Sequence, residues 1–420
     1  MKSLAAACLL QLAAAAAETL AIKVGVLRQA HSRETLSILH IPAADDTLAG
    51  ALLGAADNNT TGKFTNQSFE ALDAKLEGDA DIDVTVESLV EKGARFIVAD
   101  LPADRLLAAS ERAKEKGALL FNVSAHDDRL REEDCRANVI GVAPTRSMLA
   151  DGLAQYLVWK QWRKWLLIKG SHREDELLAQ AYRRSAKKFG ANIVEERVYE
   201  DTGGGRRSDS GSVQTQRQIP ALTQSAPNYD VLVGADESEV FAGYLPYHTL
   251  DPRPVAGSAG LYPTNWDPSH EQWGAHKLQN RFMATFHRLM NARDNNAWLA
   301  MRMIGEAATR TATNDVEKLR AYMESSDFSI AAFKGVRQTL RSWNNQLRQP
   351  ILLSDGRLIV SVSPQEGFLH QVKELDTFGL DQPETKCKIA VTAQLRRFEY
   401  HRSQPTSRPR HPLTGYQNCL

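Results

Sequence analysis

The chain has 420 residues, and its 51 basic side chains balance its 51 acidic ones. Balanced charge argues against a nucleic-acid partner or an anionic membrane surface, because both select strongly basic proteins. A chain of this length exceeds what one hydrophobic core usually serves, so we expect two lobes. No segment beyond the N-terminal region has the length and apolarity of a membrane span, so an embedded protein is not expected.

The first 17 residues have the layout of a secretory signal peptide. Lys2 supplies a positive end, residues 4–16 an apolar run, and residues 15–17 a small-residue cleavage site before Glu18. The apolar run is too short for a membrane helix, which needs about 20 residues. A buried first helix is the alternative. We expect a soluble, exported protein whose mature chain begins near Glu18.

Strands and helices alternate along the first part of the mature chain. The apolar patterns predict, in order, a strand at 22–27, a helix at 48–57, a strand at 69–76, a helix at 84–92, a strand at 95–99, a helix at 103–116 and a strand at 118–123. Gly93 and Gly117 follow two of these helices directly, as C-terminal glycines do. The alternation predicts right-handed βαβ units around a mostly parallel sheet.

The same alternation restarts after Pro144. The predicted elements are a helix at 147–160, a strand at 165–169, a helix at 173–189, strands at 192–199 and 230–233, a helix at 238–244 and a strand at 254–258. Residues 201–217, which are rich in Gly, Ser and Arg, are predicted to form a loop. Two such series joined by an extended connection predict an α/β protein with two doubly wound, Rossmann-like lobes.

The last part of the chain changes character. Helices are predicted at 277–291, 296–311 and 316–325, and extended segments at 350–353 and 358–362. Residues 388–420 lose all periodicity and carry Pro, Arg and His, so we expect a disordered tail there.

Three cysteines remain once Cys8 leaves with the signal peptide: Cys135, Cys387 and Cys419. An oxidising compartment permits one disulfide, and we favour Cys135–Cys387 because Cys419 lies in the unpatterned tail. Three unpaired thiols are the alternative. Spacings this wide give no zinc signature, so no metal site is expected.

No motif in the chain indicates catalysis. The glycine-rich run at 202–207 lacks both the Walker ending and the dinucleotide-loop spacing, so a flexible surface loop is the better interpretation. No GxSxG, HExxH or SxxK motif with a later KTG is present. The scattered histidines lack ligand spacing. We expect neither an enzyme nor a bound cofactor.

The loops at the carboxyl ends of the parallel strands are the candidate ligand site, because open α/β sheets bind ligands at that edge. For any one of these residues, a plain loop or capping role is the alternative. The candidates are Gln29, His31, Leu101, Ala103, Ser124 and Ala125 in the first lobe, Ser171, His172, Asp236 and Glu237 in the second, and Tyr262 and Trp266 in a following loop.

The order of elements, the export signal and these loops resemble type I periplasmic solute-binding proteins, the class that includes the leucine/isoleucine/valine receptors. The resemblance covers about residues 20–387. More specific stretches resemble a subfamily of ABC substrate-binding proteins that are encoded with PQQ-dependent alcohol dehydrogenase systems: DNNTTGKF at 57–64, LRQPI at 347–351, SPQEGFLH at 363–370 and DQPE at 381–384.

The resemblance implies two lobes joined by a three-strand hinge, a Venus-flytrap arrangement. Residues 18–140 and 258–355 would form the first lobe, residues 141–257 and 356–387 the second, and the crossings would lie near 138–144, 257–261 and 352–361. It also implies a non-catalytic periplasmic protein. Its partners would be a small-molecule ligand, trapped as the lobes close, and the permease of an ABC transporter.

One departure from the amino-acid receptors bears on the ligand. Where they offer a hydroxyl residue and free amides to the ligand carboxylate, this chain has Leu101-Pro102-Ala103, and proline has no N–H. Ser124 matches their second hydroxyl position, and Asp236 and Glu237 match the region that holds the ligand ammonium. A less polar solute is therefore favoured over a standard amino acid.

Two other functions stay open. The protein could be an accessory or assembly factor that binds a periplasmic PQQ-dependent dehydrogenase. It could also be an enzyme on the same scaffold, which the absence of a visible nucleophile–base pair makes the weakest hypothesis.

Overall fold

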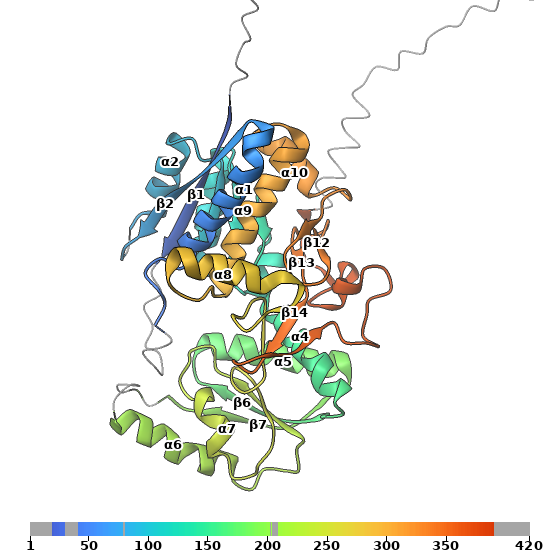
Figure 1. The fold of residues 1–420 in the computed structure, drawn as a ribbon. Coiled ribbons are helices and arrows are strands. Elements are labelled where there is room, and N and C mark those ends of the chain that lie inside the picture. The colour runs from blue at the N-terminus through green and yellow to red at the C-terminus, as the bar shows by residue number, and fades with distance from the viewer. Residues whose placement is uncertain (1–18, 30–40, 79, 202, 204–208, 390–420) are drawn as a thin grey trace, which may run out of the picture.

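The computed structural model describes residues 19–29, 41–78, 80–201, 203 and 209–389. The predicted signal peptide, His31 and residues 390–420 of the predicted tail lie outside the described residues. The described chain forms two α/β lobes with a narrower region between them (Figure 1). This confirms the predicted fold class.

The first lobe is a five-stranded parallel sheet in the order β2-β1-β3-β4-β5. Its strands are β1 (Leu20–Gln29), β2 (Gln67–Leu76), β3 (Phe96–Asp100), β4 (Leu119–Asn122) and β5 (Val139–Gly141). Helices cover both faces: α1 (Leu48–Thr65), α8 (Ala275–Phe286), α9 (Ala292–Thr311) and α10 (Val316–Met323) on one, α2 (Ile82–Glu91) and α3 (Ala103–Glu115) on the other.

Strand β3 shows why the sequence folds this way. Phe96 and Val98 pack in the core under α1 and α9, whereas Ile97 and Ala99 pack in the core under α2 and α3. A strand buried on both faces has a continuous apolar run instead of an alternating one. The first lobe could be predicted from such apolar runs and from the glycines that end the helices between them.

The second lobe is a four-stranded parallel sheet in the order β7-β6-β8-β9. Its strands are β6 (Lys164–Gly170), β7 (Asn192–Tyr199), β8 (Val231–Ala235) and β9 (Val255–Gly257). One face packs against α4 (Arg146–Trp159) and α5 (Arg173–Phe189), and the other against α6 (Asp209–Thr223) and α7 (Leu245–His248).

Several predictions about elements were wrong. The helix predicted at 238–244 is a turn followed by a short 3-10 helix, Ala242–Tyr244, and the helix predicted at 277–291 ends at Phe286, because His287 adopts a left-handed conformation. The helix predicted at 48–57 continues to Thr65, because the Asn58 side chain faces inward and donates to the carbonyl of Met301 on α9 at 2.7 Å. The loop predicted at 201–217 contains the start of α6, and in its part from 213 to 223 the buried side chains are Thr215, Ile219 and Thr223, two of which are polar. Such a helix has too weak an apolar period to be recognised.

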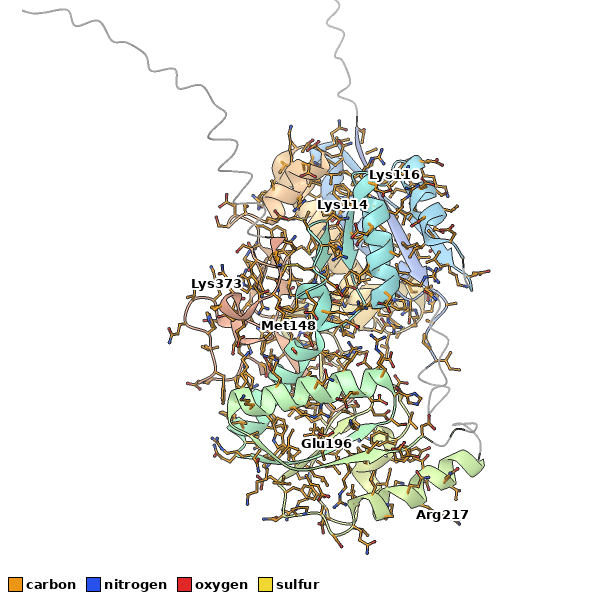
Figure 2. The ribbon with its side chains drawn as sticks, turned by 180° about the vertical axis from the view of Figure 1, so that it is seen from behind. Lys114, Lys116, Met148, Glu196, Arg217 and Lys373 are labelled. Carbon is orange, nitrogen blue, oxygen red and sulfur yellow. A yellow bond between two sulfur atoms is a disulfide. The ribbon has the colours of Figure 1, made fainter. Side chains whose placement is uncertain are left out.

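Three crossings join the lobes, and core membership locates them. Val142, Trp266 and Leu347 belong to the core of the first lobe, whereas Met148, Ala256 and Ile351 belong to that of the second. Met148 lies at the junction of the two lobes (Figure 2). These core memberships place the three crossings at 143–147, 257–265 and 348–350.

The third crossing comes earlier than the predicted 352–361. Ile351 and Leu353, which the sequence assigned to the first lobe, pack in the core of the second. They lie on β14 (Ile351–Ser354), which pairs antiparallel with β10 (Tyr262–Thr264) and β15 (Ile359–Ser363). The short strands β11 (Ile330–Ala331), β12 (Arg337–Leu340) and β13 (Leu347–Arg348) form a separate antiparallel sheet.

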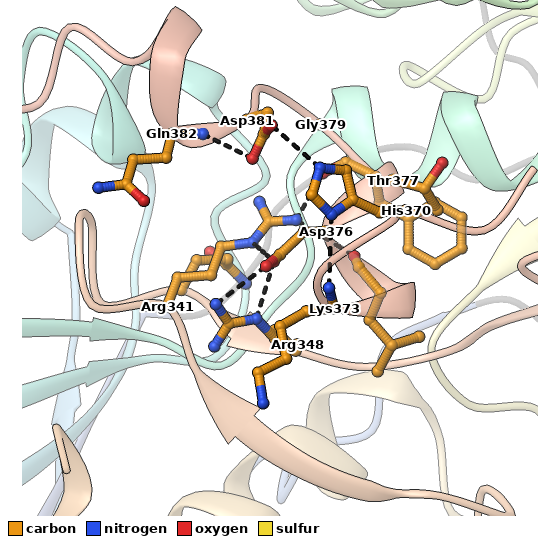
Figure 3. Close-up of polar contacts among 12 residues, drawn as sticks. Arg341, Arg348, His370, Lys373, Asp376, Thr377, Gly379, Asp381 and Gln382 are labelled. Carbon is orange, nitrogen blue, oxygen red and sulfur yellow. Dashed lines mark hydrogen bonds and ion pairs between the residues drawn. The ribbon is translucent and has the colours of Figure 1, made fainter. Parts of the chain in front are cut away.

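A C-terminal strap, residues 374–387, contacts both lobes. On the first lobe, the buried Asp376 carboxylate accepts hydrogen bonds from Arg341 Nε at 2.9 Å and Arg348 Nε at 2.8 Å (Figure 3). Both guanidinium groups also lie over the Trp343 ring, with centroid distances of 5.3 and 5.2 Å. The two buried positive charges are thus held by one carboxylate and one aromatic face.

On the second lobe, the strap is held by α4 and α5. Asp151 accepts a hydrogen bond from the Gly379 amide at 2.8 Å and forms ion pairs with Arg184 and Lys188. Lys188 Nζ also donates to the carbonyls of Thr377 and Gly379, at 2.6 and 2.9 Å. The strap therefore limits how far the lobes can separate.

The strap ends in a disulfide between Cys387 and Cys135, the pair favoured from the sequence. Its neighbours Thr385 and Lys386 contact Glu132, two further contacts between the strap and the first lobe. The bond joins residues 252 positions apart, so it removes a large amount of freedom from the unfolded chain.

We expect the double variant Cys135→Ser/Cys387→Ser to lose about 2–5 kcal/mol of unfolding free energy, because the long covalent loop is opened. Urea denaturation of the wild-type and variant proteins measures the difference. A reducing agent should lower the wild-type midpoint and leave the variant unchanged. Equal midpoints for the two oxidised proteins would contradict the structural role of the bond.

Lys334 is a buried amine bonded to the third crossing. Its Nζ donates to Gln349 Oε1 at 2.7 Å, and Gln349 Nε2 donates to the carbonyl of Val142 at 2.7 Å. The side chain is 1% exposed, and this burial lowers the pKa of Lys334 to about 7. The folded protein therefore releases a proton that the unfolded chain still binds between pH 7 and the ordinary lysine value of 10.5.

The free energy of unfolding should consequently rise with pH from about 7 toward 10.5, since the unfolded state binds more protons in that window. Lys334→Met should flatten this slope, whereas Lys318→Met, at an exposed lysine of α10, should keep it. Urea midpoints measured from pH 6 to 10 provide the test. Identical slopes for the two variants would contradict a buried, proton-releasing Lys334.

Candidate ligand-binding cleft

A cleft of about 510 Å³ lies between the lobes at the carboxyl ends of their strands. The first lobe contributes the loops after β3 and β4 and the start of α9, and the second contributes the loops after β8 and β9 and the starts of α4 and α5. A second hollow of about 870 Å³ shares His126, Ser258, Tyr262 and Arg293 with the cleft and continues it. The volume suits a small organic molecule.

Several predicted site residues line this cleft together. They are Leu101, Ala103, Ser124, Ala125, Asp236, Glu237 and Tyr262. They come from both lobes, as expected for the edge where parallel strands end.

The other predicted residues are placed elsewhere or not described. Trp266 is 2% exposed and packs in the core of the first lobe, so it does not line the cleft. Ser171 and His172 contact Asp201 after β7, with Ser171 Oγ accepting its amide hydrogen and His172 Nε2 lying 2.9 Å from its carboxylate. Gln29 is half-buried at the end of β1, outside the residues that line the cleft.

Sequence reasoning missed the arginines of the cleft. Arg146 and Arg173 are the first residues of α4 and α5, and Arg293 is in the first turn of α9. Arg293 was missed because that helix was predicted to begin at 296, whereas Asn291 caps it and starts it at Ala292. Arg173 lies in the loop that was predicted to reach this edge, beside Ser171 and His172, but was not singled out as a site residue.

On the first lobe, Asn122 shapes the turn that presents Ser124 and Ala125. Its Nδ2 donates to the Ala125 carbonyl at 2.8 Å, and its Oδ1 accepts from the Ala125 amide at 3.0 Å. The next helix, α3, begins after Pro102 with no side-chain cap. Asp104, in the first turn of this helix, forms an ion pair with Arg129.

On the second lobe, the Asp236 side chain stabilises the loop in which it lies. Its carboxylate accepts three backbone N–H groups, from Val240 at 2.8 Å and from Phe241 and Ala242 at 2.7 Å. Burial raises the pKa of Asp236 while these hydrogen bonds oppose the shift. The side chain is thus part of the loop structure and offers little to a ligand.

Arg146 holds two carboxylates of the cleft, one from each lobe. Its Nε and Nη2 donate to the two oxygens of Glu237 at 2.6 and 2.7 Å, and its Nη1 lies 2.9 Å from Asp127 Oδ2. The Arg146 side chain is 6% exposed. Burial lowers the pKa of Arg146, but the bonds to Glu237 and the charge of Asp127 more than offset it, so the net shift is upward.

The remaining walls are largely apolar. Leu149, Leu177, Leu178 and Tyr182 face the cleft from α4 and α5. His126, from the first lobe, is half-buried with Nδ1 2.6 Å from the carbonyl of Pro144, and desolvation lowers its pKa, which favours the neutral ring. These surfaces suit the hydrocarbon part of a solute.

The described residues contain no group of three or more His, Cys, Asp or Glu side chains placed to hold a metal ion. Within the same ranges, no helix is long and apolar enough to cross a bilayer.

Residues 41–355 match the family model of the periplasmic binding proteins. The chain belongs to the periplasmic binding protein family. Members of this family bind solutes and are not enzymes, in agreement with the expectation from the sequence. No match was found among curated proteins.

This periplasmic binding protein also has the fold of solved members. A branched-chain amino acid ABC transporter ligand-binding protein from Burkholderia xenovorans superposes with a TM-score of 0.67 at 18% identity, covering 88% of this chain and 100% of that chain. An ABC transporter solute-binding protein from R. palustris, solved with benzoate, gives 0.63 at 13% identity over 88% and 99%. A branched-chain amino acid transporter protein from Streptococcus pneumoniae, solved with isoleucine, gives 0.59 at 14% over 82% and 99%.

We expect Asp236→Ala to lower the free energy of unfolding by about 3 kcal/mol, because each buried N–H left unsatisfied costs about 1–3 kcal/mol. Glu174→Gln, at an exposed position of the same cleft, should change it by less than about 0.5 kcal/mol. Urea denaturation of both variants measures the difference. Equal stability would show that the Asp236 carboxylate is not needed by its loop.

Proposed function

We propose that this periplasmic binding protein is the substrate-binding component of an ABC-type transport system and takes up a small solute in the cleft between its lobes. The observation that carries the proposal is the cleft itself, which both lobes line and which three crossings span. The solved proteins of the same fold support it, since they include ABC transporter receptors solved with isoleucine and benzoate.

Binding would act through closure of the lobes. A solute that contacts both lobes favours the closed form by its differential affinity for that form. Closure expels water and so strengthens polar contacts to the solute. A membrane permease that recognises the closed form would then engage the loaded protein. The periplasmic protein would thus have two partners, the small-molecule ligand and the permease.

A narrower proposal links the protein to PQQ-dependent alcohol oxidation. Its support is the sequence resemblance of the four motifs named above. Their places in the fold are structural: Asp57 accepts from Trp298 Nε1 at 2.9 Å and pairs with Arg281, and the motif at 347–351 contains the third crossing. These motifs characterise the subfamily but do not line the cleft, so they carry no information on the ligand.

The alternative is an accessory factor that binds a periplasmic PQQ-dependent dehydrogenase. It would not require the protein to bind a small solute, so solute binding separates the two functions.

Thermal unfolding of the mature protein tests the proposal against a panel of short alcohols, aldehydes, acids, amino acids, PQQ and Ca²⁺. A true ligand at one hundred times its Kd should add about 2.7 kcal/mol of stability. Leu177→Trp, which places a bulky ring in the cleft, should abolish the shift, whereas Val84→Trp on the exposed face of α2 should keep it. No shift from any solute, together with co-purification of a dehydrogenase, would favour the accessory function.

A further inference from the structure

We propose that Arg146 is a built-in cation that takes the place of a ligand ammonium, and that the cleft therefore selects carboxylic acids with an apolar body and no ammonium group. The inference rests on the proposed function and names the class of solute. It follows from the way the charged side chains of the cleft are already used.

Four carboxylates of the cleft are already bonded within the protein. Asp236 accepts three backbone amides, and both oxygens of Glu237 are bonded by the Arg146 guanidinium. Asp127 pairs with the same arginine, and Asp104 pairs with Arg129. An ammonium entering the cleft would have to displace Arg146 from a buried bidentate pair, which is costly.

Two further acidic residues line the cleft. Glu239 interacts within the protein, and its buried Oε2 accepts no hydrogen bond from the described residues. Glu174 is exposed, so its charge is solvated.

Two arginines of the cleft remain able to bind an anion. Arg293 of the first lobe is 25% exposed, and among the described residues its ion-pair partner, Asp46, has an oxygen 4.0 Å from Nη1. Arg173 of the second lobe is exposed and lines the same cleft. Arginine binds carboxylates bidentately, so an acid held between the two would link the lobes.

The apolar walls specify the rest of the solute. Leu149, Leu177 and Leu178 and the ring of Tyr182 offer hydrocarbon and aromatic contact to the body of an acid. A branched aliphatic or aromatic monocarboxylate has both required parts, an anionic head and an apolar body.

Matched pairs of probes test this selectivity in isothermal titration calorimetry of the mature protein. 4-Methylpentanoate and leucine share a skeleton and differ in the ammonium, and benzoate and benzylamine differ in the sign of their charge. We expect the acids to bind at least about tenfold more tightly than their ammonium-bearing partners, since a displaced charge-assisted hydrogen bond costs that much or more. Equal or tighter binding of leucine or benzylamine would overturn the inference while leaving the protein a solute receptor.

Variants test the roles of the arginines. Arg146→Ala should gain binding of benzylamine, because it frees Glu237 and Asp127. Arg293→Gln, at a partly exposed position, should weaken benzoate binding about tenfold without loss of fold. Arg320→Gln, on the surface helix α10, is the matched control and should change neither. If Arg146→Ala does not fold, unchanged benzoate binding by Arg293→Gln still overturns the inference.

If no acid binds, the inference is overturned. A separate experiment then decides whether the protein binds any small solute. Native mass spectrometry of the protein purified from its own periplasm detects a retained small molecule of any class. A retained solute that carries an ammonium would preserve the proposed function and reject the carboxylate class.

Discussion

The pairing of Arg146 with Glu237 and Asp127 is the constraint on which the cleft depends. A guanidinium that is 6% exposed must be neutralised, and here the neutralising groups come from the two lobes that the cleft separates. The arginine is the first residue of α4 and lies in the first crossing, so the chain places it between the lobes, where it lines the cleft. The shape of the cleft and its charge are thus set by one ion-pair network.

The other polar clusters limit the motion of the lobes. Asp376 joins the strap to the first lobe through Arg341 and Arg348, and Asp151 joins it to the second lobe. The disulfide makes the connection to the first lobe covalent. A receptor needs its lobes to move about the crossings, and the strap contacts both lobes, so their movement has to keep or break these contacts.

Much of the fold could be predicted from the sequence, because its signals are local. Continuous apolar runs gave β3, β4, β6 and β8, and glycines gave the ends of α2, α3 and α5. The start of α6 could not be predicted, because its sequence is mostly polar and therefore shows almost no apolar periodicity. The loops of the cleft could be predicted as a region because the topology of parallel strands fixes their edge.

Individual site residues were harder to predict, for physical reasons that differ. Trp266 has a large aromatic side chain of the kind that lines binding sites. It lies just after the second crossing, however, and its side chain packs in the core of the first lobe. Asp236 and Glu237 are in the cleft, yet their partners, backbone amides and Arg146, are fixed only by tertiary structure. Sequence shows which charges are present, whereas coordinates show which of them are already paired.

The account is tested most directly by a crystal structure of the mature protein with its tightest-binding solute. We expect the anionic group of the solute to lie between Arg173 and Arg293, with Arg146 still bonded to both oxygens of Glu237. A solute cation bonded to Glu237, with Arg146 displaced from the cleft, would contradict it.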